Sequence, residues 1–87
     1  MKFRIMKFII NMVESYLDGN TIPIGYSIEN IEKTPVSSVE TLGKLTLRDD
    51  LFKISYLVEF IELIPLHGSG VDNINYIKSV SVINSTT

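Results

Sequence analysis

The chain has 87 residues, a net charge of −2 at pH 7 and no cysteine. A chain of this length forms one small domain, residues 1–87, that buries only roughly 60–65% of its unfolded surface, so a partner or a second copy would add stability. The acidic balance excludes a global basic field for nucleic acid, and the absence of cysteine excludes disulfides, thiol catalysis and cysteine-bound zinc.

The first predicted element is an amphipathic helix over residues 3–18. Its polar side chains fall into one arc when the segment is wound at about 100° per residue, and apolar side chains cover the rest. Gly19 follows where a left-handed C-cap belongs. The pattern therefore predicts a helix with a wide apolar face.

After Gly19 the period of the apolar residues changes from helical to alternating. Residues 22–28 alternate and predict a strand, with Pro23 near its start because proline belongs at an edge or at the beginning of a strand. We interpret KTPVSS, residues 33–38, as a loop, and residues 39–47 as a weaker strand broken by Gly43.

Residues 51–64, LFKISYLVEFIELI, form the most apolar run of the chain. As a strand, the run places Phe52, Ile54, Tyr56, Val58 and Phe60 on one face. As a helix, it would carry a stripe that starts at Leu47 and ends at Ile61. Because β-branched and aromatic residues outnumber good helix formers, we predict a strand, preceded by a turn at Asp49-Asp50.

The remainder of the chain is predicted to be a long loop followed by a strand. Residues 65–73 contain two glycines, Asp72 and Asn73, which are typical of loops. Residues 73–83 alternate again, and Lys78 interrupts an otherwise apolar face that consists of Ile74, Tyr76, Val80 and Val82. These elements predict an α+β fold in which an N-terminal amphipathic helix packs on a mostly antiparallel sheet of about four strands.

No residue pattern predicts catalysis, a cofactor or a metal site. His67 lies beside Ser69, but neither the G-x-S-x-G context nor an orienting acid accompanies them. The paired carboxylates, such as Asp49 and Asp50, match no known ligand spacing. We therefore expect a protein that is not an enzyme, and we expect no cofactor.

The N-terminal basic residues Lys2, Arg4 and Lys7 could neutralise only a few phosphates, so nucleic-acid binding is not favoured. No apolar run approaches the roughly 18–20 residues of a membrane-spanning helix, and no secretory cleavage site follows the basic start. We therefore expect a cytoplasmic protein without membrane contact.

The second face of the predicted strand over residues 51–64 indicates an interface. Leu51, Leu57, Ile61 and Leu63 alternate with the covered face, and no second helix is predicted to shield them. Burying each would contribute roughly 1.5–3 kcal/mol, and an apolar patch of this kind usually marks a binding surface. Together with two charged residues of the run, the predicted interface contains Leu51, Leu57, Glu59, Ile61, Glu62 and Leu63. We expect a partner protein, self-association into a homo-oligomer, or both.

The segment FIINMVESYLDGN, residues 8–20, resembles the opening helix of small bacterial immunity proteins, which neutralise toxins. Those helical families continue with another helix, whereas here Pro23 and a two-residue alternation follow. The resemblance implies an inhibitor, and small phage inhibitors of bacterial defence share the size and acidity. The alternative is a protein that binds a small molecule or nucleotide in a pocket between subunits, with His67 and Ser69 in a loop at its mouth.

Overall fold

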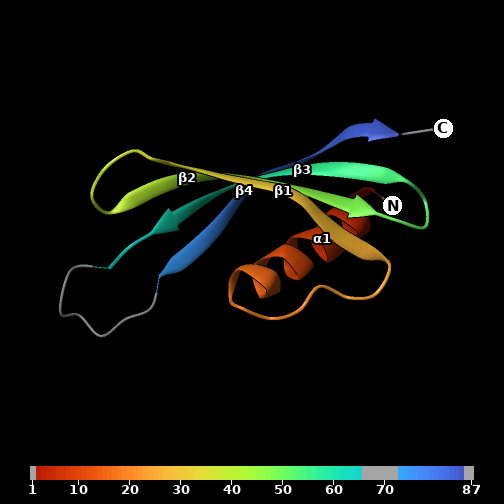
Figure 1. Cartoon of the computed structure of the whole chain (residues 1–87), viewed down its shortest axis with the longest axis horizontal. Helices are drawn as coiled ribbons and strands as arrows, with labels where there is room; N and C mark the ends of the chain where they lie inside the picture. Colours follow the sequence, from red (N-terminus) through yellow and green to blue (C-terminus); the bar gives the residue numbers. More distant parts are fainter. Residues whose placement is uncertain (1, 66–72, 86–87) are drawn as a thin grey trace.

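The computed structural model describes residues 2–65 and 73–85 and shows one helix packed on a four-stranded antiparallel sheet. The strands follow one another in the order β1-β2-β3-β4, so every neighbouring pair in the sheet is also consecutive in the chain. The elements are α1 (Lys2–Leu17), β1 (Tyr26–Pro35), β2 (Glu40–Asp49), β3 (Ile54–Leu63) and β4 (Ile74–Ser85). This arrangement confirms the α+β fold, with α1 on one face of the sheet (Figure 1).

The core lies between α1 and the face of the sheet that α1 covers. Successive residues of a strand point to opposite faces, so only every second side chain of β2 and β3 reaches the helix. These side chains meet a stripe of α1 at helical spacing. Among the residues whose burial the structure describes, the buried apolar ones are Ile9, Met12 and Val13 of α1, Leu45 and Leu47 of β2, and Tyr56, Val58 and Phe60 of β3.

The helix ends at the glycine that the sequence indicated. Gly19 has a φ of 99°, and its N–H donates to the carbonyl of Tyr16 at 3.0 Å. The N–H of Asn20 donates to the carbonyl of Ser15 at 3.1 Å. These two bonds form a Schellman motif, in which a residue with positive φ satisfies the last free carbonyls of the helix.

The sheet is longer than the helix that covers it. The molecule measures 48 × 22 × 22 Å, and its radius of gyration of 13.9 Å exceeds the value of about 12 Å for a compact chain of this length. The 16 residues of α1 span about 24 Å, whereas strands of 10–12 residues span about 34–40 Å. The β1–β2 turn consequently projects beyond α1 (Figure 1).

The first strand begins later than the alternation predicted. Residues 22–25 precede β1, and residues 33–35, predicted as loop, belong to it. A turn precedes the strand, in which the N–H of Tyr26 donates to the carbonyl of Pro23 at 3.2 Å and Gly25 adopts a φ of 99°. Ile22 packs against the core from this connection, while Ile24 is fully exposed. The apolar alternation therefore extends into a connecting segment.

Gly43 does not break the second strand, contrary to the sequence interpretation. It pairs with Lys33 of β1 and Phe60 of β3, in the middle of a continuous β2. The ring of Phe60 occupies the space where a Cβ of residue 43 would project. Because glycine has no Cβ, the fully buried ring of Phe60 can lie directly against the backbone of β2. Gly43 therefore serves this close contact and does not mark a reversal of the chain.

The third strand confirms the strand interpretation of the apolar run, but it starts at Ile54. Leu51 and Phe52 lie in the preceding turn, where Asp49 Oδ1 accepts hydrogen bonds from their N–H groups at 3.1 and 3.0 Å. Lys53 closes the turn with a φ of 56°. Phe52 was predicted on the covered face and is instead exposed, because the Asp49 cap reverses the chain before the strand resumes.

The fourth strand changes face part-way along its length. Lys78 lies between Ser79, which pairs with Glu59, and Ile77, which pairs with Phe60, so Lys78 is an additional bulge residue. The prediction that Ile74, Tyr76, Val80 and Val82 share one face is wrong, because the bulge puts the first two on the face opposite the last two. A second bulge at Ile83 and one at Glu29 of β1 interrupt the two edge strands.

Candidate functional site

The face of the sheet opposite α1 is formed by rows of side chains that the register aligns across the strands. Leu42 of β2 lies opposite Ile61 of β3, which lies opposite Tyr76 of β4. The adjacent row joins Leu63 to Ile74. We call the continuous cluster of Leu42, Ile61, Leu63, Ile74 and Tyr76 the open-face patch. Leu57 lies on the same face, but Glu59 separates it from this cluster.

The open-face patch contains two of the predicted interface residues, Ile61 and Leu63. Leu57 shares their face, as the alternation of the strand predicted, but lies on the other side of Glu59. The predicted residue Leu51 does not, because it lies in the exposed turn before β3. The sequence also missed Leu42, Ile74 and Tyr76, whose side chains are 39%, 44% and 52% exposed. Only the register of β2 and β4 against β3 brings these last three residues together.

The two predicted glutamates of β3 point to opposite faces of the sheet. Glu59 lies on the open face, where Ser79 Oγ donates to its Oε1 at 3.0 Å. Glu62 lies on the α1 side, where its Oε1 is 3.6 Å from Lys33 Nζ and its Oε2 accepts from Asn73 Nδ2 at 3.2 Å. Glu62 therefore belongs to the polar end of the covered face, beyond α1, and not to the open face.

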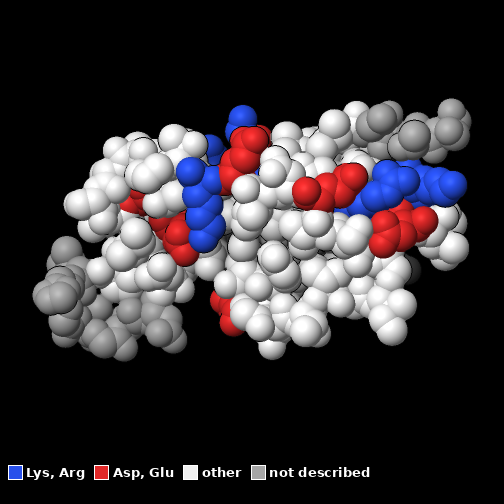
Figure 2. Space-filling model, viewed as in Figure 1, with Lys and Arg blue, Asp and Glu red and all other residues white. Residues whose placement is uncertain are grey.

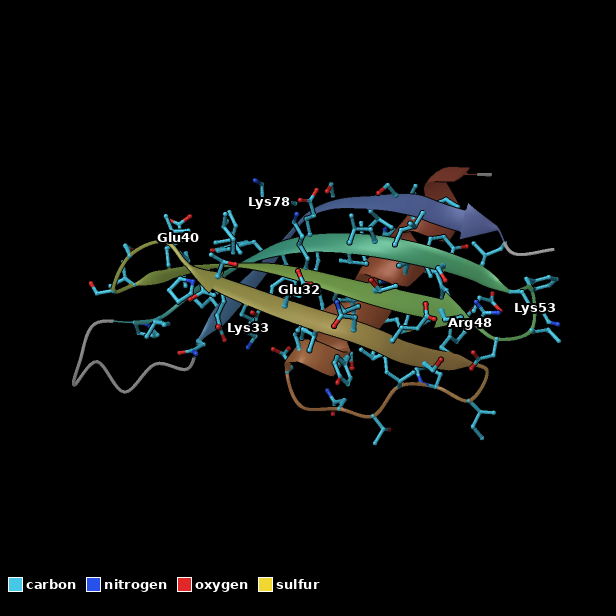
Figure 3. All side chains as sticks on the ribbon, turned by 45° about the horizontal axis from the view of Figure 1, so that its top comes forward. Glu32, Lys33, Glu40, Arg48, Lys53 and Lys78 are labelled. Atoms are coloured by element: carbon cyan, nitrogen blue, oxygen red, sulfur yellow. The ribbon has the colours of Figure 1, made fainter. Side chains whose placement is uncertain are left out.

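A charged row borders the open-face patch. Glu32, Lys44 and Glu59 lie side by side on β1, β2 and β3, in the register position next to Leu42 and Ile61. Figure 3 shows Glu32 over the middle of the sheet, between Glu40 at one end and Lys53 at the other. On the side seen in Figure 2, positive and negative groups alternate along the long axis, so no field of one sign covers it. A polar rim beside an apolar centre is typical of protein interfaces.

A second feature, which the sequence did not predict, is a pocket between α1 and the β2–β3 turn. Its volume is about 340 Å³, and we call it the aromatic pocket. It is lined by Phe8, Ile9, Tyr26, Asp49, Phe52, Ile54 and Tyr56. The rings of Phe8 and Tyr26 stand 6.0 Å apart, centre to centre, with a tilt of 55°. These residues come from four separate stretches of the chain, so no local sequence pattern predicts the pocket.

Burial and a nearby carboxylate shift the acidity of the two tyrosines in the aromatic pocket. Burial raises the pKa of Tyr56, and the negative charge of Asp49 adds to the rise. Burial likewise raises the pKa of Tyr26, with smaller contributions from Asp49 and Tyr56. Both hydroxyls are thus held in the neutral form, and Asp49 lies close enough to act on each of them.

The raised pKa values predict a loss of stability at high pH. Because the folded pKa values of Tyr26 and Tyr56 lie above the unfolded value of about 10, their stabilising contribution is complete below that pH and is lost as pH rises through the folded values. Tyr26→Phe and Tyr56→Phe are expected to flatten this fall in urea denaturations between pH 8 and pH 11. Tyr76→Phe, on the other face, is the control, and an equal flattening by all three variants would contradict the prediction.

Within residues 2–65 and 73–85, no three histidine, cysteine or acidic side chains gather as metal ligands would. In the same part of the chain, no helix is both long and apolar enough to cross a membrane. His67 and Ser69, the predicted ligand loop, lie outside the described residues.

Comparisons with known proteins do not assign this chain to a family. Searches against protein-family models, curated proteins and solved structures found no match. The open-face patch and the aromatic pocket are therefore interpreted from their own chemistry.

Proposed function

We propose that this protein is a non-enzymatic interaction module that inhibits a partner protein by binding and occluding it. The observation that supports the proposal is the open-face patch, because no described segment of the chain covers its five apolar side chains on three adjacent strands. Water-exposed apolar area costs about 25 cal/mol per Å², so a covering surface would stabilise this face. Bacterial immunity and phage anti-defence inhibitors are the class that fits a small acidic chain of this kind.

The proposal assigns two states to the open-face patch. In the absence of the partner, two copies of the chain cover each other's patch and form a homodimer. The partner then competes for the same surface, with the row of Glu32, Lys44 and Glu59 at its rim. Contact between the apolar centres of the two surfaces excludes water. The charged residues at the rim determine the orientation of the bound partner more than its affinity.

Ile61→Lys tests this proposal at the centre of the open-face patch. The lysine is tolerated in the single chain because Glu59 lies on the same face, but it places a charge in the interface. Light scattering at tens of micromolar is expected to give a dimer for the native chain and a monomer for the variant. A partner captured from host lysate by the native chain is expected to be lost by the same variant.

The matched control is Ile24→Lys, since Ile24 is apolar, fully exposed and outside the open-face patch. It is expected to keep both the dimer and the partner. A monomeric native chain that captures nothing, or equal effects of the two lysines, would overturn the proposal. Thermal denaturation of both variants verifies that the fold is retained.

A second candidate function is the binding of a small molecule, and the aromatic pocket favours it. Pockets for small ligands are concave, mostly apolar and supplied with a few polar groups, and they measure about 300–1,000 Å³. The aromatic pocket, at about 340 Å³, is at the small end of this range and is built from one chain. This size, and the lack of lysine and arginine among the described lining residues, favour a small ligand over a nucleotide.

A further inference from the structure

The aromatic pocket concentrates aromatic side chains. The chain contains four phenylalanines and four tyrosines, and half of these eight residues line this one pocket. They are Phe8, Tyr26, Phe52 and Tyr56. The faces of aromatic rings carry partial negative charge, so rings that surround a cavity attract a cation within about 6 Å of their centres.

Two of these rings stand at the mouth of the pocket and are in contact with water. Phe8 is 52% exposed and Phe52 is 69% exposed. Phe52 is held by the turn in which Asp49 Oδ1 accepts its N–H at 3.0 Å, and Phe8 is held by α1 against Tyr26. Both rings are thus positioned by their backbone before any ligand arrives, which reduces the ordering cost of binding.

A carboxylate lies in the same wall. Asp49 is 7% exposed, and its Oδ1 is used by the N–H groups of Leu51 and Phe52. Among the described residues, the two ion pairs join Lys33 to Glu62 and Arg48 to Asp50, so neither involves Asp49. The described residues of the pocket wall include no basic side chain either. A buried negative charge without a counter-ion favours a cationic ligand.

We propose that the aromatic pocket binds an alkylammonium group, with its methyl or methylene groups against the rings of Phe8, Tyr26, Phe52 and Tyr56 and its positive charge toward Asp49. An anion would meet the Asp49 carboxylate. A hydrated metal ion would find one carboxylate where several oxygen ligands are required. An uncharged apolar molecule would fill the space but would leave the charge of Asp49 without a partner.

This inference rests on the second candidate function and not on the open-face patch. The two surfaces are on opposite faces of the sheet, so their variants separate the two proposals. Ile61→Lys is expected to leave alkylammonium binding unchanged, and changes in the aromatic pocket are expected to leave the oligomeric state unchanged.

The test compares choline with 3,3-dimethyl-1-butanol, which has the same shape without the charge. Aromatic ¹H–¹³C NMR of the full chain follows the pocket rings during each titration. Choline is expected to bind about tenfold more tightly than the neutral isostere, because cation–π attraction and the Asp49 charge act only on the cation. A third titration with Nα-acetyl-trimethyllysine amide shows whether a side chain of a modified protein is accepted as well as a free small molecule.

Two variants locate the binding. Asp49→Asn keeps an Oδ1 that can accept the two turn N–H groups and removes the charge, so it is expected to weaken choline about tenfold and to leave the isostere unchanged. Phe52→Leu removes an exposed ring, which does not threaten the fold, and is expected to weaken choline several-fold. Tyr76→Leu, an aromatic change on the open face, is the control. Equal affinity for choline and the isostere, or binding of neither, would overturn the proposal.

Discussion

Replacing Gly43 with alanine is expected to lower the free energy of unfolding by about 3 kcal/mol, because the new methyl group overlaps the ring of Phe60. The ring is fully buried and lies against β2, so it cannot move without disturbing the core. Small domains have only about 5–15 kcal/mol of stability, so the loss is a large share of the total. Urea denaturation monitored by circular dichroism measures it.

A double-mutant cycle identifies the cause of this loss. In Gly43→Ala/Phe60→Leu, the smaller side chain makes room for the methyl group, so the double variant is expected to lose at least about 1 kcal/mol less than the sum of the two single changes. Gly25→Ala is the matched control, because it has positive φ and open space around it. Its cost is expected to add to that of Phe60→Leu. Additive costs for Gly43 and Phe60 would show that the overlap is not the cause.

Deleting Lys78 is expected to change stability by less than about 1 kcal/mol, whereas deleting Thr46 is expected to abolish folding. Lys78 is a bulge residue, so without it Ile77 and Ser79 become neighbours and still face Phe60 and Glu59. Thr46 lies in β2, which is paired on both sides.

The large effect of the Thr46 deletion follows from the two-residue period of a strand. Leu45 and Leu47 are both fully buried, and without Thr46 they would point to opposite faces. Each displaced leucine costs about 1.5–3 kcal/mol, and all side chains beyond it are displaced as well. Circular dichroism and thermal melting compare the two deletions. Similar melting temperatures would contradict the register and the bulge.

The elements with complete local signals could be predicted from the sequence. The amphipathic arc and Gly19 are enough to define α1 and its end, since a helix repeats within a few residues. The run that became β3 was ambiguous, and its β-branched and aromatic content correctly favoured a strand. Its alternation also placed Leu57, Ile61 and Leu63 on one face, and the last two belong to the open-face patch.

The features that depend on distant residues could not be predicted. Gly43 was interpreted as a break because the reason for it, Phe60, belongs to the next strand. The bulge at Lys78 appeared only as an exception in a pattern, and nothing local shows that the exception reverses the face of the strand. The aromatic pocket unites residues from α1, β1, β3 and the β2–β3 turn, so it exists only once the chain is folded.

The order of the elements has a consequence for synthesis on the ribosome. The helix emerges before the strands, yet the side chains that cover Ile9, Met12 and Val13 belong to β2, β3 and β4. Until β4 has left the exit tunnel, the apolar stripe of the nascent α1 lacks its full covering, so the helix cannot complete its packing in the order in which the chain is made. Each later strand then joins the neighbour made just before it, through short-range contacts that form quickly. The folding of this protein is therefore expected to start with the pairing of consecutive strands, and α1 is expected to pack on the sheet once β4 has joined it.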